Sequence, residues 1–182
     1  MNRPMLIGER DKEGMTAQQL AVFDKIASGP RKDVPFPFLA MLDSPEVADV
    51  VQTVGSVIRY GSKMPADLRE VAILATAAAF GSNYEWQYHV AIARQLGLSE
   101  EVIKAASSGK ADSRIDPLFA ATIGLCWEAV RGRRIDPDAL TIIRNSVGRK
   151  IATELVLIPG YYQLLGLFLS AGELDEPQQY TA

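Results

Sequence analysis

The segment Leu68–Leu98, LREVAILATAAAFGSNYEWQYHVAIARQLGL, decides the fold. Between Val71 and Phe80 its only polar residue is Thr76, so the helix that it predicts is apolar on every side. A helix that is apolar all round is buried in the core of a protein. Gly81 favours the left-handed conformation that ends a helix, and a second, polar and aromatic helix follows it. The segment therefore predicts a buried helix with an antiparallel neighbour.

Start and stop signals divide the rest of the chain into further helices. Gly148 separates a helix near 137–147 from a long apolar segment, which Pro159 is expected to kink. No stretch of any length shows the two-residue period of a strand. We therefore predict an all-α fold of about seven or eight helices, packed as antiparallel hairpins. Four helix starts are marked by a capping box or by a capping residue before proline, at Thr16 with Gln19, Ser44-Pro45, Asp116-Pro117 and Asp136-Pro137.

Length and composition place the chain among globular proteins. It has 182 residues, of which 48% are hydrophobic, enough for one well-packed domain. We predict an N-terminal arm at residues 1–15 and a single helical domain at residues 16–182. The net charge of −3 gives no basic surface for nucleic acid, so no nucleic-acid partner is expected.

The apolar segments are too short for a membrane span. The longest apolar run, Leu155–Leu169, contains Pro159 and Gly160 and falls short of the roughly 20 residues that cross a bilayer. We expect it in the core or in a contact between subunits. Residues 1–14 contain no signal-peptide pattern, and the single cysteine, Cys126, cannot form an internal disulfide. These features predict a cytoplasmic protein without a membrane partner.

The central segment also holds the residues that suit acid–base chemistry. His89 is the only histidine of the chain, and it shares a helix face with Ser82 and Glu85. Glu70 lies about three turns before the helix break and His89 about two turns after it, so a water or ligand between them is geometrically possible. Burial raises the pKa of a carboxyl group, and a neighbouring carboxylate raises that of an imidazole. Such a pair can transfer a proton at neutral pH.

The two central residues also have structural interpretations. Glu70 could form an ion pair with Arg69, with Arg94 or with a partner subunit, and His89 could be satisfied by Glu85 four residues before it. These alternatives stay open at this point.

Metal binding and thiol chemistry have little support. Glu85 and His89 supply only two ligands on one helix face, so no metal site is predicted. Cys126 lies in an apolar helix face next to Trp127, which predicts an inert, buried thiol.

The central segment resembles the carboxymuconolactone decarboxylase family, which includes the AhpD-like alkylhydroperoxidases. In the AhpD-like branch a glutamate is followed by a cysteine twelve residues on, a second cysteine three further and a histidine four after that. The same spacing here gives Glu70, Ser82, Glu85 and His89, so the acid and the imidazole are kept and both thiols are missing. The resemblance extends from about residue 36 to residue 174, and it implies an AhpD-like fold.

The missing thiols separate the two chemistries of that family. Peroxide reduction in the thiol branch uses a Cys-x-x-Cys pair, which Ser82 and Glu85 cannot replace. Peroxiredoxin activity would therefore rest on family kinship alone. The cysteine-less branch includes the decarboxylase that converts 4-carboxymuconolactone to the enol-lactone of β-ketoadipate in aromatic compound catabolism. That reaction needs no cofactor, because the carbanion delocalises into the unsaturated lactone.

The resemblance implies a cofactor-free carbon–carbon lyase that acts on a small carboxylic acid such as a lactone acid. In this hypothesis His89 delivers or relays a proton, Glu70 sets the protonation of His89, and Glu85 is the third catalytic residue. Family members are trimers or hexamers, so a homo-oligomer is expected. The residues assigned to the substrate pocket are Ser82, Tyr84, Trp86, Phe36, Phe38 and Tyr161.

Two alternatives remain beside the lyase. An alkylhydroperoxidase-like antioxidant would have to use Cys126 for peroxide reduction. A non-catalytic helical module would place Glu70 against His89 with no cavity between them.

Overall fold

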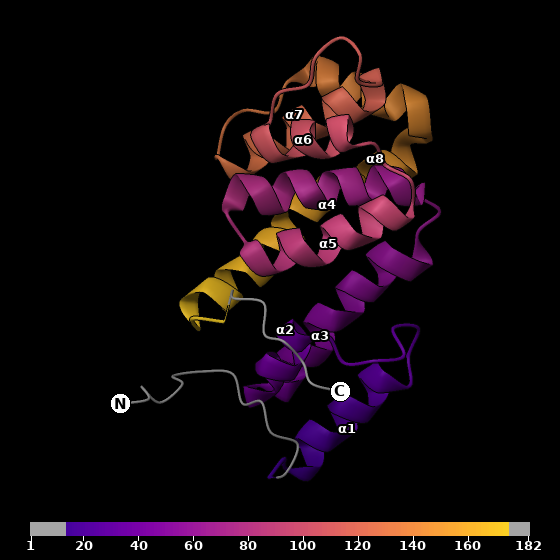
Figure 1. Cartoon of the computed structure of the whole chain (residues 1–182). Helices are drawn as coiled ribbons and strands as arrows, with labels where there is room; N and C mark the ends of the chain where they lie inside the picture. The colour runs from indigo at the N-terminus through magenta and orange to yellow at the C-terminus, as the bar shows by residue number, and fades with distance from the viewer. Residues whose placement is uncertain (1–13, 175–182) are drawn as a thin grey trace. The chain divides into compact units, whose positions relative to one another are not determined.

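The computed structural model describes residues 14–174, and within that range it contains eight α-helices and no strand (Figure 1). The all-α prediction is therefore confirmed. Residues 1–13 of the predicted N-terminal arm lie outside the described residues. The elements are α1 (Ala17–Ala27), α2 (Phe36–Ala40), a 3-10 turn η1 (Met41–Asp43), α3 (Pro45–Ser56), a π-helical turn η2 (Val57–Gly61), α4 (Ala66–Phe80), α5 (Asn83–Gln95), α6 (Glu100–Ser108), α7 (Pro117–Val130) and α8 (Pro137–Ala171).

Backbone contacts group the described residues into two compact units. The first contains residues 14–61 with 171–174, and the second contains residues 62–170. Glu70, Ser82, Glu85, His89 and Cys126 all belong to the second unit. The single domain that the sequence predicts for residues 16–182 stays a prediction.

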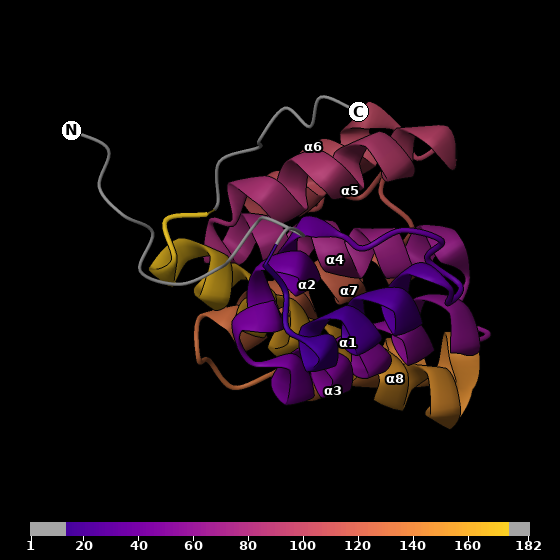
Figure 2. The same cartoon turned by 90° about the horizontal axis from the view of Figure 1, so that it is seen from below.

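In the first unit, α1 lies along α3 (Figure 2). The capping box that begins α1 is present as predicted. The backbone N–H of Gln19 donates to the Thr16 hydroxyl at 3.3 Å, and the backbone N–H of Thr16 donates to the Gln19 side chain at 2.8 Å. Two orphan donors at the helix start are satisfied in this way.

In the second unit, α4 is the central helix, and it packs against α5, α6 and α7 (Figure 1). Leu68 and the residues from Glu70 to Ala77 are all buried, as an all-round apolar helix requires. Gly81 ends α4 with a left-handed φ of 87°, and Ser82 then occupies the N-cap position of α5. The short break keeps α4 and α5 adjacent, which confirms the predicted hairpin.

Gly148 divides α8 into two helical parts, as the sequence predicts. Its φ of 79° and ψ of 164° are the interior backbone angles of α8 that depart from helical values. The second part continues through Pro159 without a break. A bent or weakened hydrogen-bond ladder at proline is compatible with helical angles when packing holds the helix in place.

By length and apolar composition alone, α8 is the one described helix that could cross a membrane. This is weak support for a span, because Gly148 divides the helix and Leu155, Tyr161 and Leu169 are buried inside the protein. Leu164, by contrast, is 44% exposed. The subunit contact expected for Leu155–Leu169 stays a prediction.

We expect Gly109→Ala to destabilise the second unit. Gly109 ends α6 with a φ of 69°, and a Cβ atom there would lie 2.6 Å from the Trp127 ring. The ring cannot easily move, because its Nε1 donates to the Ala106 carbonyl at 2.9 Å and the Arg131 guanidinium lies over it. We expect a loss of about 1–3 kcal/mol from overpacking, in addition to backbone strain. Urea denaturation measures the total.

Gly97→Ala is the matched control for this substitution. Gly97 also has a left-handed φ, 82°, but a Cβ atom there would meet nothing within 4 Å. The Gly97→Ala variant should therefore lose only the free energy of unfolding that corresponds to backbone strain, about 1–2 kcal/mol. Equal losses in the two variants would show that the contact between Gly109 and Trp127 is unimportant.

Candidate active site

The structure brings Glu70 and His89 into direct contact. Glu70 lies in the first half of α4 and is 0% exposed, while His89 lies in α5 and is 1% exposed. His89 Nδ1 is 2.6 Å from Glu70 Oε2, which is a short, charge-assisted hydrogen bond. The two side chains therefore leave no room for a water or ligand between these atoms, although their spacing in the sequence allowed one. The reason is the close packing of α4 on α5, which brings the two buried groups together directly.

A second carboxylate lies at the other nitrogen of the imidazole. Glu85 is 3% exposed, and its Oε2 is 3.6 Å from His89 Nε2, one helical turn away. On the far side of Glu70, Arg69 Nε is 3.6 Å from Glu70 Oε1. We call Arg69, Glu70, His89 and Glu85, in this order, the buried charge row. Arg94 is not part of it, because Arg94 pairs with Glu100 at 2.7 Å.

The buried charge row is costly unless its charges compensate one another. An ionised carboxylate inside a protein needs a nearby cation or hydrogen-bond donors. The row contains two carboxylates, one guanidinium and one imidazole, so its formal charges balance when His89 is protonated. A buried imidazole between two carboxylates is able to accept a proton at one nitrogen and release one at the other.

Two tyrosine rings also pack against the imidazole of His89. The Tyr162 ring of α8 meets the His89 ring edge-on at 5.3 Å, and the Tyr88 ring does so at 5.2 Å. The predicted pocket residue Tyr161 contacts Tyr162 at 5.3 Å. Tyr162 is a site residue that the sequence motif does not identify. The sequence signal for its burial is the helical spacing of four apolar or aromatic residues, all of them buried: Ile158, Tyr162, Leu165 and Leu169.

The other predicted pocket residues divide between the two units. Ser82 is buried at the start of α5, and Trp86 is half-buried one turn later. Tyr84 stacks on Tyr88, with ring centroids 6.2 Å apart. Phe36 and Phe38 are buried in α2 of the first unit, and their assignment to the pocket stays a prediction.

Cys126 is an inert thiol in this structure. It is fully buried in α7, and burial raises the pKa of its thiol to about 12, although a hydrogen bond with Thr76 opposes the shift. A thiol of that pKa has almost no thiolate at neutral pH, and the thiolate is the reactive form. The prediction of a buried thiol in an apolar helix face is confirmed.

We expect Cys126 to resist thiol reagents while the protein is folded. At pH 8 an aromatic disulfide reagent should label native protein only as fast as the core opens, and it should label protein unfolded in urea at once. The release of the coloured thiol measures both rates. Rapid labelling of native protein would contradict the burial of Cys126.

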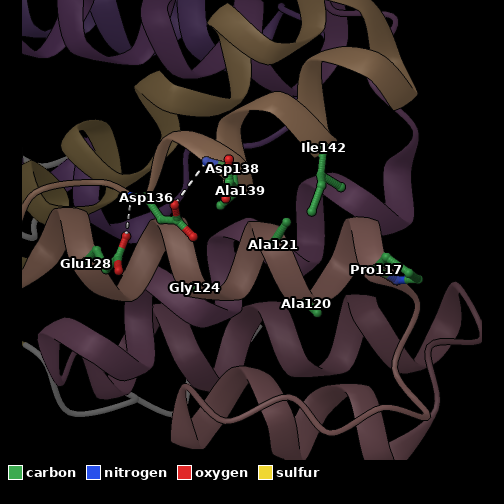
Figure 3. A pocket seen from close by; sticks show the side chains of 9 residues that line it. All are labelled: Pro117, Ala120, Ala121, Gly124, Glu128, Asp136, Asp138, Ala139 and Ile142. Carbon is green, nitrogen blue, oxygen red and sulfur yellow. Dashed lines mark hydrogen bonds between the residues drawn. The ribbon is translucent and has the colours of Figure 1, made fainter.

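A pocket of about 330 Å³ lies between α7 and the start of α8 (Figure 3). Two of its three acidic side chains accept hydrogen bonds from the backbone at the start of α8. Glu128 accepts from the backbone N–H of Asp136 at 2.9 Å, and Asp136 accepts from that of Asp138 at 3.0 Å. The pocket contains none of the predicted site residues. Within residues 14–174, no group of three or more His, Cys, Asp or Glu side chains is arranged to hold a metal ion.

Three solved structures share the fold of this chain. The debrominase Bmp8, as a cysteine-to-alanine variant in complex with 2,3,4-tribromopyrrole, is 15% identical with a TM-score of 0.73, over 96% of this chain and 91% of that one. The apo form of Bmp8 gives the same identity and TM-score, over 96% and 92%. A protein of unknown function from Agrobacterium tumefaciens, proposed to be the antioxidant defence protein AhpD, is 18% identical with a TM-score of 0.65, over 75% and 94%.

The sequence comparison finds a family similarity in the central part of the chain. No curated protein matches the chain. Residues 45–125 match the model of the carboxymuconolactone decarboxylase family, and this part contains Glu70, Ser82, Glu85 and His89. The matched part, residues 45–125, is thus similar to the carboxymuconolactone decarboxylase family, and the chain has an AhpD-like fold.

Proposed function

We propose that the protein is a cofactor-free carbon–carbon lyase that acts on a small carboxylic acid, with a lactone acid as the first candidate. The observation that carries the proposal is the 2.6 Å contact between His89 Nδ1 and Glu70 Oε2 in a fully buried pair. The non-catalytic helical module predicts the same direct contact, so the turnover assay below decides between the two. A hydrogen-bonded carboxylate orients an imidazole and stabilises the imidazolium form, as general acid–base catalysis requires.

The proposed step is a decarboxylation followed by protonation. The bond between the carboxylate carbon and its neighbour breaks, CO₂ leaves, and the electron pair delocalises into the unsaturated lactone. A proton then adds to the carbon next to the lactone carbonyl, at the far end of the delocalised system, and this gives the enol-lactone. The protein has to supply that proton and hold the acid in place, and neither task needs a redox group.

In this proposal Glu70 orients His89, and the proton passes from His89 to Glu85. Since Nδ1 is held by Glu70, the nitrogen left for proton transfer is Nε2, and the carboxylate beside Nε2 is that of Glu85. Glu85 is therefore assigned the delivery of the proton to the substrate, and His89 its relay. Solvent replaces the proton after each turnover.

The arrangement of the residues does not support the thiol-based alternative. Ser82 and Glu85 stand where the thiol branch has its cysteine pair, and Cys126 is a buried thiol with a pKa of about 12. Peroxide reduction needs an accessible thiolate and a resolving thiol. Within the described residues, the chain provides neither.

Incubation of the purified protein with 4-carboxymuconolactone in deuterated water tests the proposal. We expect CO₂ release without any added cofactor and incorporation of solvent deuterium into the product. The saturated lactone acid is the matched control substrate, because its carbanion has no conjugated acceptor. An organic hydroperoxide with a dithiol reductant and a brominated pyrrole complete the panel. Turnover of the hydroperoxide or the pyrrole, with no turnover of the lactone acid, would refute the lyase.

A further inference from the structure

We propose that Arg69 is a positioning residue that fixes the tautomer of His89, acting through the carboxylate of Glu70. The use of this tautomer in catalysis rests on the proposed lyase function. Which ring nitrogen of His89 carries the hydrogen follows from the charges of the buried charge row alone.

Arg69 is a largely buried cation with one carboxylate near it. Its side chain is 14% exposed, and its Nε atom is buried without a hydrogen-bond partner among residues 14–174. The distance of 3.6 Å from Nε to Glu70 Oε1 is too long for a hydrogen bond but suits an ion pair. Arginine stays charged under all ordinary conditions. The guanidinium therefore favours the ionised form of Glu70 electrostatically, without binding it in a fixed hydrogen-bond geometry.

The charge of Glu70 decides which nitrogen of His89 carries the hydrogen. An ionised carboxylate can only accept a hydrogen bond, so the 2.6 Å contact requires a hydrogen on Nδ1. In the neutral imidazole Nε2 is then free of hydrogen, and Nε2 is the atom that lies 3.6 Å from Glu85. If Glu70 were protonated, it would donate to Nδ1, and the hydrogen of the neutral ring would lie on Nε2.

The other ionisable groups at the imidazole do not fix this choice. Glu85 and Tyr88 lie on the same helix as His89, and Tyr162 approaches from α8 with its ring edge. Glu85 lies at Nε2, where an ionised carboxylate would favour the opposite tautomer. Arg69 is thus the residue of the row that keeps the hydrogen of the neutral ring on Nδ1, which faces Glu70. Without it, the hydrogen could move to Nε2, which faces Glu85. With the hydrogen on Nδ1, Nε2 can take up a proton and pass it to Glu85, as the lyase relay requires.

Nitrogen NMR of protein labelled in histidine tests the proposal. His89 is the only histidine, so its two ring nitrogens need no assignment by mutation. Above the titration of the ring, we expect Nδ1 at the pyrrole-type position and Nε2 at the pyridine-type position. In Arg69→Met the two patterns should mix or exchange, while Arg69→Lys, which keeps the charge, should preserve the parent pattern. Arg94→Met is the matched control, because Arg94 pairs with the exposed Glu100, and it should change nothing.

Two results would overturn the role of Arg69. One is a parent protein in which Nε2 carries the hydrogen, which needs no variant to establish. The other is a folded Arg69→Met protein with the parent pattern. If Arg69→Met does not fold, Arg69→Gln provides the same neutral change with a polar side chain. None of these spectra depends on a substrate, so a protein without lyase activity still decides the question.

Discussion

Replacing Glu70 with alanine is expected to lower the free energy of unfolding by about 3–5 kcal/mol. Glu70 is 0% exposed and holds His89 Nδ1 at 2.6 Å, with Arg69 at 3.6 Å from its other oxygen. Its removal leaves a buried guanidinium without its counter-charge and a buried imidazole without its hydrogen-bond partner. Removing one partner of a buried charged pair lowers the free energy of unfolding by far more than the intact pair contributes to it. Urea denaturation of the parent and the variant measures the loss.

Two further variants separate charge from packing. Glu70→Gln keeps the volume and an acceptor oxygen, so it should lose less than Glu70→Ala. Glu100→Ala removes an exposed carboxylate paired with Arg94, and its unfolding midpoint should stay close to that of the parent. If Glu70→Ala and Glu100→Ala had equal midpoints, the buried charge row would have no structural importance.

Replacing His89 with asparagine is expected to lower the turnover of the lactone acid by about 10²–10⁴-fold, the usual contribution of a general acid–base group. Asparagine keeps a polar side chain against Glu70 but cannot take up and release a proton near neutral pH. The loss should appear in kcat more than in KM, because the proton is transferred in the chemical step. Initial rates of CO₂ release over a range of substrate concentrations give both constants.

Cys126→Ser is the matched control for this experiment. It changes a buried residue of the same unit that the lyase mechanism does not use, so the turnover per folded molecule should equal that of the parent. A thiol mechanism predicts the reverse for peroxide consumption, which would be lost in Cys126→Ser and kept in His89→Asn. Circular dichroism of both variants shows whether a loss of turnover reflects unfolding.

The α4–α5 hairpin could be predicted from the sequence because its signals are local. The apolar run Val71–Phe80 determines that α4 is buried, and Gly81 determines where α4 ends. The spacing of Glu85 and His89 places both on one face of α5, since residues four apart are neighbours on a helix. Helix ends and helix faces depend on residues close together in the chain.

The contacts of His89 across helices could not be predicted in the same way. The separation of Glu70 and His89 depends on how closely α4 approaches α5 and on the rotamers of both side chains. The sequence allowed either a gap or a direct contact, and the structure has a direct hydrogen bond. Tyr162 reaches His89 from α8, far along the chain, and only the tertiary packing shows which of two adjacent tyrosines faces the imidazole. The buried Nε atom of Arg69 likewise became apparent only with the side chains in place.

The central claim is that Glu70 and His89 act as one proton-transferring unit, and a double-mutant cycle on turnover tests it most directly. The four proteins are the parent, Glu70→Gln, His89→Asn and the double variant, each assayed for CO₂ release from the lactone acid. Residues that act as a unit are strongly non-additive, so the double variant should be little slower than His89→Asn alone. Losses that multiply in the double variant, or single variants as active as the parent, would contradict the claim.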